Sequence, residues 1–220
     1  MTIRRKISLC LNVIIIVTVI FSTVSLFTGF KFMGQFGLFE PFGLKSFKYF
    51  TVDSNILAGI VSLIYIGFLF VHSENKHLNY HWLYILKLSA TTAVSLTMII
   101  TIFFLAPSAE HFYDLFLNSN LFMHLLTPIL CIISFIFFEP FGKPAFSLTL
   151  TGLLPMLCYA AYYIPNIFIH LENGKTSYEY DWYGFLKGGL NTIWFVMLIL
   201  FSLTLIISIS LWALNKKNAK

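Results

Sequence analysis

Six long apolar stretches divide the chain, and shorter polar or glycine- and proline-containing segments separate them. The stretches fall near residues 7–28, 51–71, 84–106, 121–138, 146–165 and 188–213. A transmembrane helix needs about 17 to 25 mainly apolar residues, and these stretches have about that length. The pattern therefore predicts an all-α fold in which six transmembrane helices form a single domain over residues 1–220.

The composition points the same way and argues against an ordinary soluble domain. Apolar residues make up 58% of the chain and charged residues 10%, and the mean hydropathy is +0.84. Soluble domains average about 25% charged residues. The net charge is +5, but the basic residues do not form the clustered, aromatic-rich surface of a nucleic-acid-binding protein. We therefore expect membrane lipids, and no nucleic acid, as partners.

The positions of lysine and arginine predict the orientation, because cytoplasmic loops carry an excess of positive residues. With the amino terminus inside, the cytoplasmic side holds Arg4, Arg5, Lys6, Lys76, Lys87, Lys143, Lys216, Lys217 and Lys220. The other side holds only Lys31, Lys45, Lys48, Lys175 and Lys187. The first apolar stretch is too long for a signal peptide and is interpreted as a retained helix. Both termini are predicted to be cytoplasmic.

The second apolar stretch opens with a cluster of polar side chains that no other stretch has. Thr51, Asp53, Ser54 and Asn55 fall within its first two turns. Helical geometry places Thr51, Ser54 and Asn55 on one face, and Asp53 about 200° round the helix. Asp53 is then an acid stabilised by the helix dipole, a surface charge, or a partner for a polar group on another helix.

The fourth apolar stretch carries a histidine near its start. Asn120, His124 and Thr127 are spaced one helical turn apart along one face, and Pro128 follows directly. An ionisable side chain inside a membrane span is a functional-site hypothesis by default. Because the second and fourth helices start on the same side of the membrane, Thr51 and His124 are predicted to lie at similar depth. A hydroxyl beside an imidazole is the minimum set for nucleophilic acyl transfer.

Other polar residues receive structural interpretations. Lys87 lies near the cytoplasmic end of the third stretch and is expected to extend its ammonium group to the membrane surface. His77 and His81 have a spacing that could bind a metal on a helix, but they lack a third ligand, so we expect no metal and no other cofactor. The segment 166–187 is interpreted as too polar to be buried, and it could cover the surface that His124 approaches.

The motifs resemble the six-span androgen-induced protein family, whose members are threonine hydrolases of fatty acid esters of hydroxy fatty acids. The resemblance rests on Phe50-Thr51, on Asn120-x-x-Met123-His124 with Pro128 shortly after, and on the number and order of the spans. The proline stands one place closer to the histidine than in the animal members. The Thr-Val-Asp-Ser-Asn and Phe-Glu-Pro stretches are closer to uncharacterised bacterial six-span relatives.

The resemblance implies an integral membrane hydrolase of lipid-like fatty acid esters near the outer leaflet of a bacterial plasma membrane. It assigns Thr51 as the nucleophile and His124 as the general base. Asn55, Asn120 and Asp53 are candidates to bind the oxyanion or orient the substrate. A backbone amide is the alternative oxyanion donor, and Asp53 orients His124 if it turns inward. The alternatives are a non-catalytic membrane protein that binds a lipid or small molecule in the same cavity and, with less support, a transporter. A cleft that reaches both Thr51 and His124 would favour the hydrolase.

Overall fold

The computed structural model describes residues 2–33, 43–72 and 80–218 and confirms the six-helix membrane architecture. Six helical spans in this part of the chain are long and apolar enough to cross a membrane: Ile3–Thr28, Phe50–Val71, His81–Ser108, Ser119–Phe138, Phe146–Ile169 and Leu190–Asn218. Each corresponds to one of the predicted apolar stretches. The protein is therefore a multi-pass integral membrane protein.

Several spans are built from more than one helical segment. The α-helices are α1 (Ile3–Thr28), α2 (Phe50–Val71), α3 (His81–Ile100), α4 (Ser119–Leu121), α5 (Thr127–Ile133), α6 (Leu154–Ile169) and α7 (Leu190–Asn218). The π-helical segments are η2 (Thr101–Leu105), η5 (Phe122–Leu126) and η6 (Ser134–Phe138). The 3₁₀ segments are η1 (Gly43–Lys48), η3 (Ala106–Ser108), η4 (Phe112–Phe116) and η7 (Phe146–Leu153).

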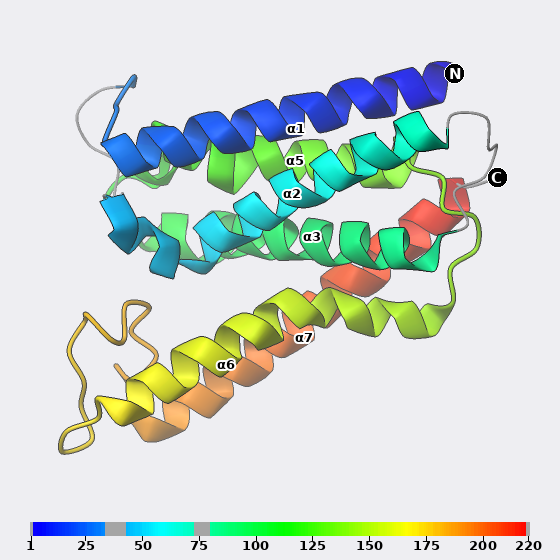
Figure 1. Ribbon diagram of the computed structural model, residues 1–220. Coiled ribbons are helices and arrows are strands. Elements are labelled where there is room, and N and C mark those ends of the chain that lie inside the picture. The colour runs from blue at the N-terminus through cyan, green and yellow to red at the C-terminus, as the bar shows by residue number, and fades with distance from the viewer. Residues whose placement is uncertain (1, 34–42, 73–79, 219–220) are drawn as a thin grey trace.

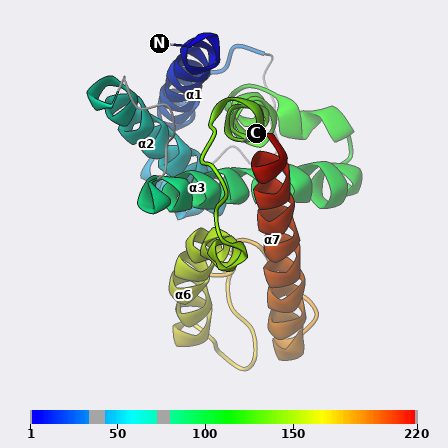
Figure 2. The ribbon, with the colours of Figure 1, turned by 90° about the vertical axis from the view of Figure 1, so that its right-hand side faces the viewer.

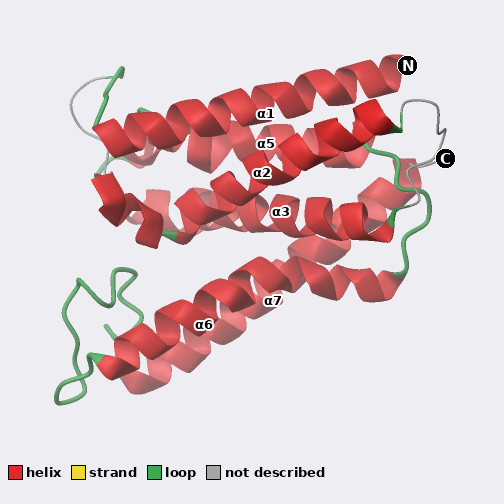
Figure 3. Ribbon diagram, viewed as in Figure 1, coloured by secondary structure: helices red, strands yellow, loops and turns green. Residues whose placement is uncertain are grey.

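Helix α3 is the centre of the bundle. It packs against α2 and α5 on one side and against η7, α6 and α7 on the other (Figures 1 and 2). Helix α1 completes the first group by packing along α2 and α5. Most of the surface of α6 and α7 stays open to the surrounding lipid, since these two spans are the least buried of the six. Figure 3 shows the described chain as helices joined by loops.

The two chain termini lie at the same end of the bundle. Nη2 of Arg4 donates a hydrogen bond of 2.9 Å to the backbone oxygen of Asn218, and Figure 1 shows both ends on one side of the molecule. We call this the termini end, and the opposite end the distal end. A shared end agrees with an even number of membrane crossings, whereas the prediction that this end is cytoplasmic rests on the lysine and arginine pattern alone.

The three π-helical segments share one sequence feature, which is a proline two residues after the segment ends. These prolines are Pro107, Pro128 and Pro140. A proline lacks the N–H that would bond four residues back, and its ring clashes with that carbonyl group. A wider turn relieves this conflict, as in η5, where the N–H of Thr127 bonds the carbonyl of Phe122 five residues earlier. The prolines therefore shift the register of the helices they interrupt.

Gly152 allows α3, η7 and α7 to approach closely. A Cβ atom at this position would lie 2.7 Å from Cβ of Ser208 and 3.0 Å from Oγ1 of Thr92. We expect Gly152→Ala to lower the free energy of unfolding by about 1 to 3 kcal/mol through overpacking, measured by denaturation in mixed detergent micelles. Gly67→Ala is the matched control, because no atom lies within 4 Å of the added Cβ. Equal stability of the two variants would contradict this packing.

Candidate functional site

His124 is buried at the distal end and is held by a hydroxyl group from another span. Its Nδ1 atom lies 2.8 Å from Oγ1 of Thr101. The histidine is 8% exposed and the threonine 1% exposed. Both residues belong to π-helical segments, His124 to η5 and Thr101 to η2, and such segments inside α-helices frequently occur at functional sites. The imidazole is therefore oriented by its environment.

The contact with Thr101 also bears on which ring nitrogen can act as a base. When Nδ1 carries the proton, it donates to the threonine oxygen, and Nε2 keeps its lone pair. No hydrogen bond from Nε2 to any described residue is present. Thr101 was not singled out from the sequence. The signal that could have found it is the proline six residues later, which marks the π-helical segment.

Thr51 lies near the same level as His124 but does not bond to it. The Nδ2 atom of Asn55 donates to the carbonyl of Thr51 at 2.8 Å and to the carbonyl of Met123 at 3.1 Å. This bridge brings the start of α2 against η5, as the depth argument predicted. Within the described residues no hydrogen bond joins the Thr51 side chain to His124. The structure thus places the two predicted catalytic residues on contacting segments, and their direct contact stays a prediction.

The two asparagines proposed as oxyanion donors differ in what they can offer. Both N–H groups of Asn55 are used by the carbonyls of Thr51 and Met123, and its buried Oδ1 atom has no partner. Asn55 therefore offers an acceptor rather than a donor. Asn120 is also buried and lies one turn before His124. For Asn120 the role of oxyanion donor stays a prediction.

The polar face predicted for the fourth span is divided in the structure. Asn120, His124 and Thr127 were expected to lie along one face. His124 bonds to Thr101 in the third span, whereas Thr127 donates to Oγ1 of Thr18 on α1 at 3.2 Å. The cause is η5, because its wider turns rotate the residues that follow relative to an ordinary α-helix.

Asp53 lies on a different side of α2 from the Asn55 bridge. It is exposed and lines a groove of about 310 Å³ between α2 and α6, together with residues such as Ser54 and Cys158. Ordinary helical spacing predicted this separation from Asn55. The group that bonds to the imidazole of His124 is the hydroxyl of Thr101, and Asp53 faces the groove instead.

A second buried polar cluster lies toward the termini end and was not predicted. Nζ of Lys87 lies 2.8 Å from Oε1 of Glu139, with the side chains 3% and 0% exposed. Asn12 and Ser134 donate to the same carboxylate oxygen at 2.9 and 2.7 Å, and Nδ2 of Asn215 donates to the backbone oxygen of Glu139 at 2.9 Å. The cluster joins four of the six spans.

This cluster corrects the interpretation of Lys87. The side chain does not extend to the membrane surface, because Glu139 supplies an opposite charge inside the bundle and Oδ1 of Asn12 accepts a hydrogen bond of 2.7 Å from its ammonium group. The ammonium also lies 4.9 Å from the centre of the Tyr65 ring. A lysine and a glutamate at the ends of two apolar stretches were the available signal, since ionisable residues in spans usually pair.

The segment between α6 and α7 is partly buried, contrary to the sequence interpretation. Asp181 and Trp182 are 5% and 4% exposed. The Asp181 carboxylate accepts hydrogen bonds from the Tyr163 hydroxyl and from the backbone N–H groups of Phe185 and Leu186, which satisfies its charge. The segment folds over the distal end of α6 and reaches α2 (Figure 1), where the Tyr183 hydroxyl accepts from the N–H of Phe50. It therefore packs against α6 and the start of α2.

In the sequence, His77 and His81 form a candidate metal-binding pair that lacks a third ligand. His77 lies outside the described residues. Among residues 2–33, 43–72 and 80–218, no group of three or more histidine, cysteine, aspartate and glutamate side chains is arranged to hold a metal ion.

Comparison of the chain with protein-family models, with curated proteins and with solved structures gives no significant match. The resemblance to the androgen-induced protein family therefore rests on the residues quoted above. What the structure itself establishes is a six-span membrane protein with a buried hydroxyl–imidazole pair at one end and a buried ion pair toward the other.

Proposed function

We propose that this membrane protein hydrolyses lipid-like fatty acid esters, with Thr51 as the nucleophile and His124 as the general base. The observation that carries the proposal is the 2.8 Å contact between Nδ1 of buried His124 and the hydroxyl of Thr101. In hydrolases with a catalytic triad, a third residue holds the histidine nitrogen that faces away from the nucleophile. Thr101 is suited to this positioning role, and Nε2 is then the nitrogen available for catalysis.

The proposed reaction has two acyl-transfer steps. His124 removes the proton of the Thr51 hydroxyl as its oxygen attacks the ester carbonyl, and the alcohol leaves with that proton. Water then attacks the acyl-threonine as His124 takes one of its protons. The fatty acid leaves, and His124 returns the proton to the Thr51 oxygen, which restores the hydroxyl. A hydrogen-bond donor to the oxyanion is worth about 3 to 4 kcal/mol, and Asn120 is the candidate. The ester would approach from the leaflet at the distal end, in the plasma membrane of a bacterial cell.

A non-catalytic lipid-binding protein is the second candidate. One observation favours it: the two grooves at the distal end that are described below are lined by neither Thr51 nor His124. An ester bound in either groove would therefore not contact Thr51 or His124. A serine-reactive phosphonate probe distinguishes the two functions, because a hydrolase of the proposed kind is labelled at Thr51 and a simple binder is not.

Loss of the Thr101 hydroxyl is expected to lower ester turnover. Thr101→Val keeps the side-chain shape but removes one hydrogen bond to His124. Such a bond contributes up to about 1.5 kcal/mol, so kcat should fall by up to about tenfold while KM changes little. Thr97→Val is the matched control, since the hydroxyl of buried Thr97 bonds to its own helix at the carbonyl of Val94. Equal kcat values for the two variants would remove Thr101 from the site.

A further inference from the structure

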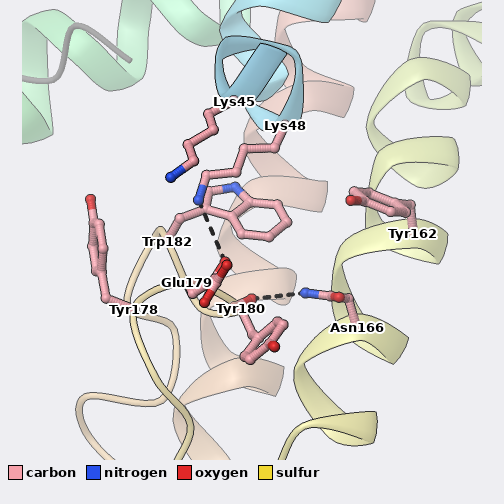
Figure 4. Close-up of a pocket in the computed structure, with 8 residues that line it drawn as sticks. All are labelled: Lys45, Lys48, Tyr162, Asn166, Tyr178, Glu179, Tyr180 and Trp182. Carbon is pink, nitrogen blue, oxygen red and sulfur yellow. Dashed lines mark hydrogen bonds between the residues drawn. The ribbon is translucent and has the colours of Figure 1, made fainter. Parts of the chain in front are cut away.

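Two neighbouring grooves lie along α6 toward the distal end, one against α2 and one against η1. The distal groove has a volume of about 490 Å³ and is lined mainly by charged and aromatic side chains from η1 and from the segment after α6 (Figure 4). The lateral groove has a volume of about 310 Å³, and its lining is largely apolar. Tyr162 lines both grooves. The two grooves therefore adjoin at Tyr162, one with a charged lining and one with an apolar lining.

One stripe of α6 forms a continuous wall of both grooves. Pro155, Cys158, Tyr162 and Asn166 recur three to four residues apart, and the first two line the lateral groove whereas Asn166 lines the distal groove. At 1.5 Å per residue, Pro155 and Asn166 are separated by about 16 Å along the helix. This is about half the thickness of the hydrocarbon core, which is the depth that a lipid chain of one leaflet occupies.

The distal groove carries a net positive charge. Lys45 and Lys48 line it together with one acidic residue, Glu179, and Figure 4 shows both ammonium groups on the same side of the groove. The ammonium of Lys48 lies 5.0 Å from the centre of the Trp182 ring. The ammonium of Lys48 donates a hydrogen bond of 3.5 Å to the backbone oxygen of Glu179, and neither lysine forms an ion pair with another residue that the structure describes.

The walls of the grooves are fixed by hydrogen bonds. The Tyr159 hydroxyl donates to the backbone oxygen of Lys48 at 2.6 Å and accepts from Nε1 of Trp182 at 2.9 Å. Nδ2 of Asn166 donates to the backbone oxygen of Tyr180 at 3.1 Å (Figure 4). Contacts of this kind join η1, α6 and the segment after α6. The lysines are thus presented by a preformed surface.

We propose that the two grooves form one binding site for an anionic phospholipid from the leaflet at the distal end. The phosphate lies between the ammonium groups of Lys45 and Lys48, and one acyl chain lies in the lateral groove. Asp53, which lines the lateral groove, keeps the anionic group at the level of the lysines, because like charges repel. Trp182 and Tyr162 lie where aromatic side chains meet the headgroup region. The site is separate from Thr51 and His124, so it does not depend on the proposed hydrolysis.

Cys158 provides a direct measure of occupancy, because it is exposed and lines the lateral groove. The full chain carrying Cys10→Ser is purified in a neutral detergent, and the alkylation of Cys158 by N-ethylmaleimide is followed by mass spectrometry. The other cysteine, Cys131, is buried. We expect phosphatidylglycerol to slow this alkylation, and phosphatidylcholine to do so only at much higher concentration.

Charge variants test the position of the phosphate. In the double variant Lys45→Gln and Lys48→Gln, the phosphatidylglycerol concentration that gives half-protection should rise about 30-fold. The reason is that each basic side chain near an anionic lipid adds to its affinity, and the variant loses two of them. The double variant Lys45→Arg and Lys48→Arg should keep the protection. Lys175→Gln is the matched control, because Lys175 is exposed and lines neither groove.

The outcomes separate a phospholipid site from its alternatives. Equal protection by phosphatidylcholine would overturn the role of the headgroup charge. Unchanged protection in the glutamine double variant, or a total lack of protection in the unaltered chain, would also overturn the proposal. Protection by inorganic phosphate alone would indicate a free-anion site in place of a lipid site. A gel-filtration profile that matches the unaltered chain shows that each variant is folded.

Discussion

Replacing Lys87 by methionine is expected to lower the free energy of unfolding by about 3 to 5 kcal/mol, because it leaves the buried Glu139 carboxylate without its opposite charge. Methionine keeps much of the length of the side chain. Asn12 and Ser134 would still donate to Glu139, but neutral donors do not compensate for the lost ammonium group. The measurement is reversible denaturation in mixed detergent micelles, followed by tryptophan fluorescence.

A double variant shows whether the loss of stability comes from the unpaired charge of Glu139. Lys87→Met combined with Glu139→Gln leaves no unpaired charge in the bundle, so most of the lost stability should return. Lys175→Met is the control for loss of a lysine, and at this exposed position we expect a change within about 0.5 kcal/mol. If Lys87→Met were as mild as this control, the buried ion pair would be contradicted.

Ester hydrolysis is expected to fall by about 10² to 10⁴-fold in His124→Ala, since that is the usual contribution of a general base. Thr51→Ala should reduce turnover to the level of vesicles without the protein, because no acyl-enzyme can form. Thr51→Ser should retain measurable turnover, since it keeps a hydroxyl group at the same position. The assay follows release of fatty acid from an ester of a hydroxy fatty acid by protein reconstituted into vesicles.

His111→Ala is the matched control for the histidine variant. His111 is exposed and precedes η4 on the same connection between the third and fourth spans. Its removal should leave turnover unchanged. Retained activity in either Thr51→Ala or His124→Ala, with the variant folded, would remove this mechanism. Labelling by the phosphonate probe at another hydroxyl would assign a different nucleophile.

The six spans could be predicted from the sequence because bilayer thickness alone sets the length of an apolar helix. The side of α2 that carries Asp53 could also be predicted, since this helix is regular and ordinary spacing applies. The division of the face of Asn120, His124 and Thr127 was missed, although Pro128 was visible. The position of a proline indicates that a helix is disturbed, but whether the response is a kink or a π-helical turn depends on the neighbouring helices.

Contacts between spans were beyond the reach of periodicity. Lys87 and Glu139 lie on the third and fourth spans, and their pairing depends on how these helices rotate about their axes. The same holds for Thr101 and His124. Depth could be predicted for such residues, because chain direction and length determine it. The side-chain partner at that depth requires the packing, which one sequence does not encode in any local pattern.

The hydrogen bond from Arg4 to the last described residues has a practical consequence for topology. Reporter proteins fused before the first helix and after the last would enter the same compartment. A pair of fusions to alkaline phosphatase and to a fluorescent protein that matures only in the cytoplasm should therefore give the same answer at both chain ends, and that answer would fix the direction of every span between them.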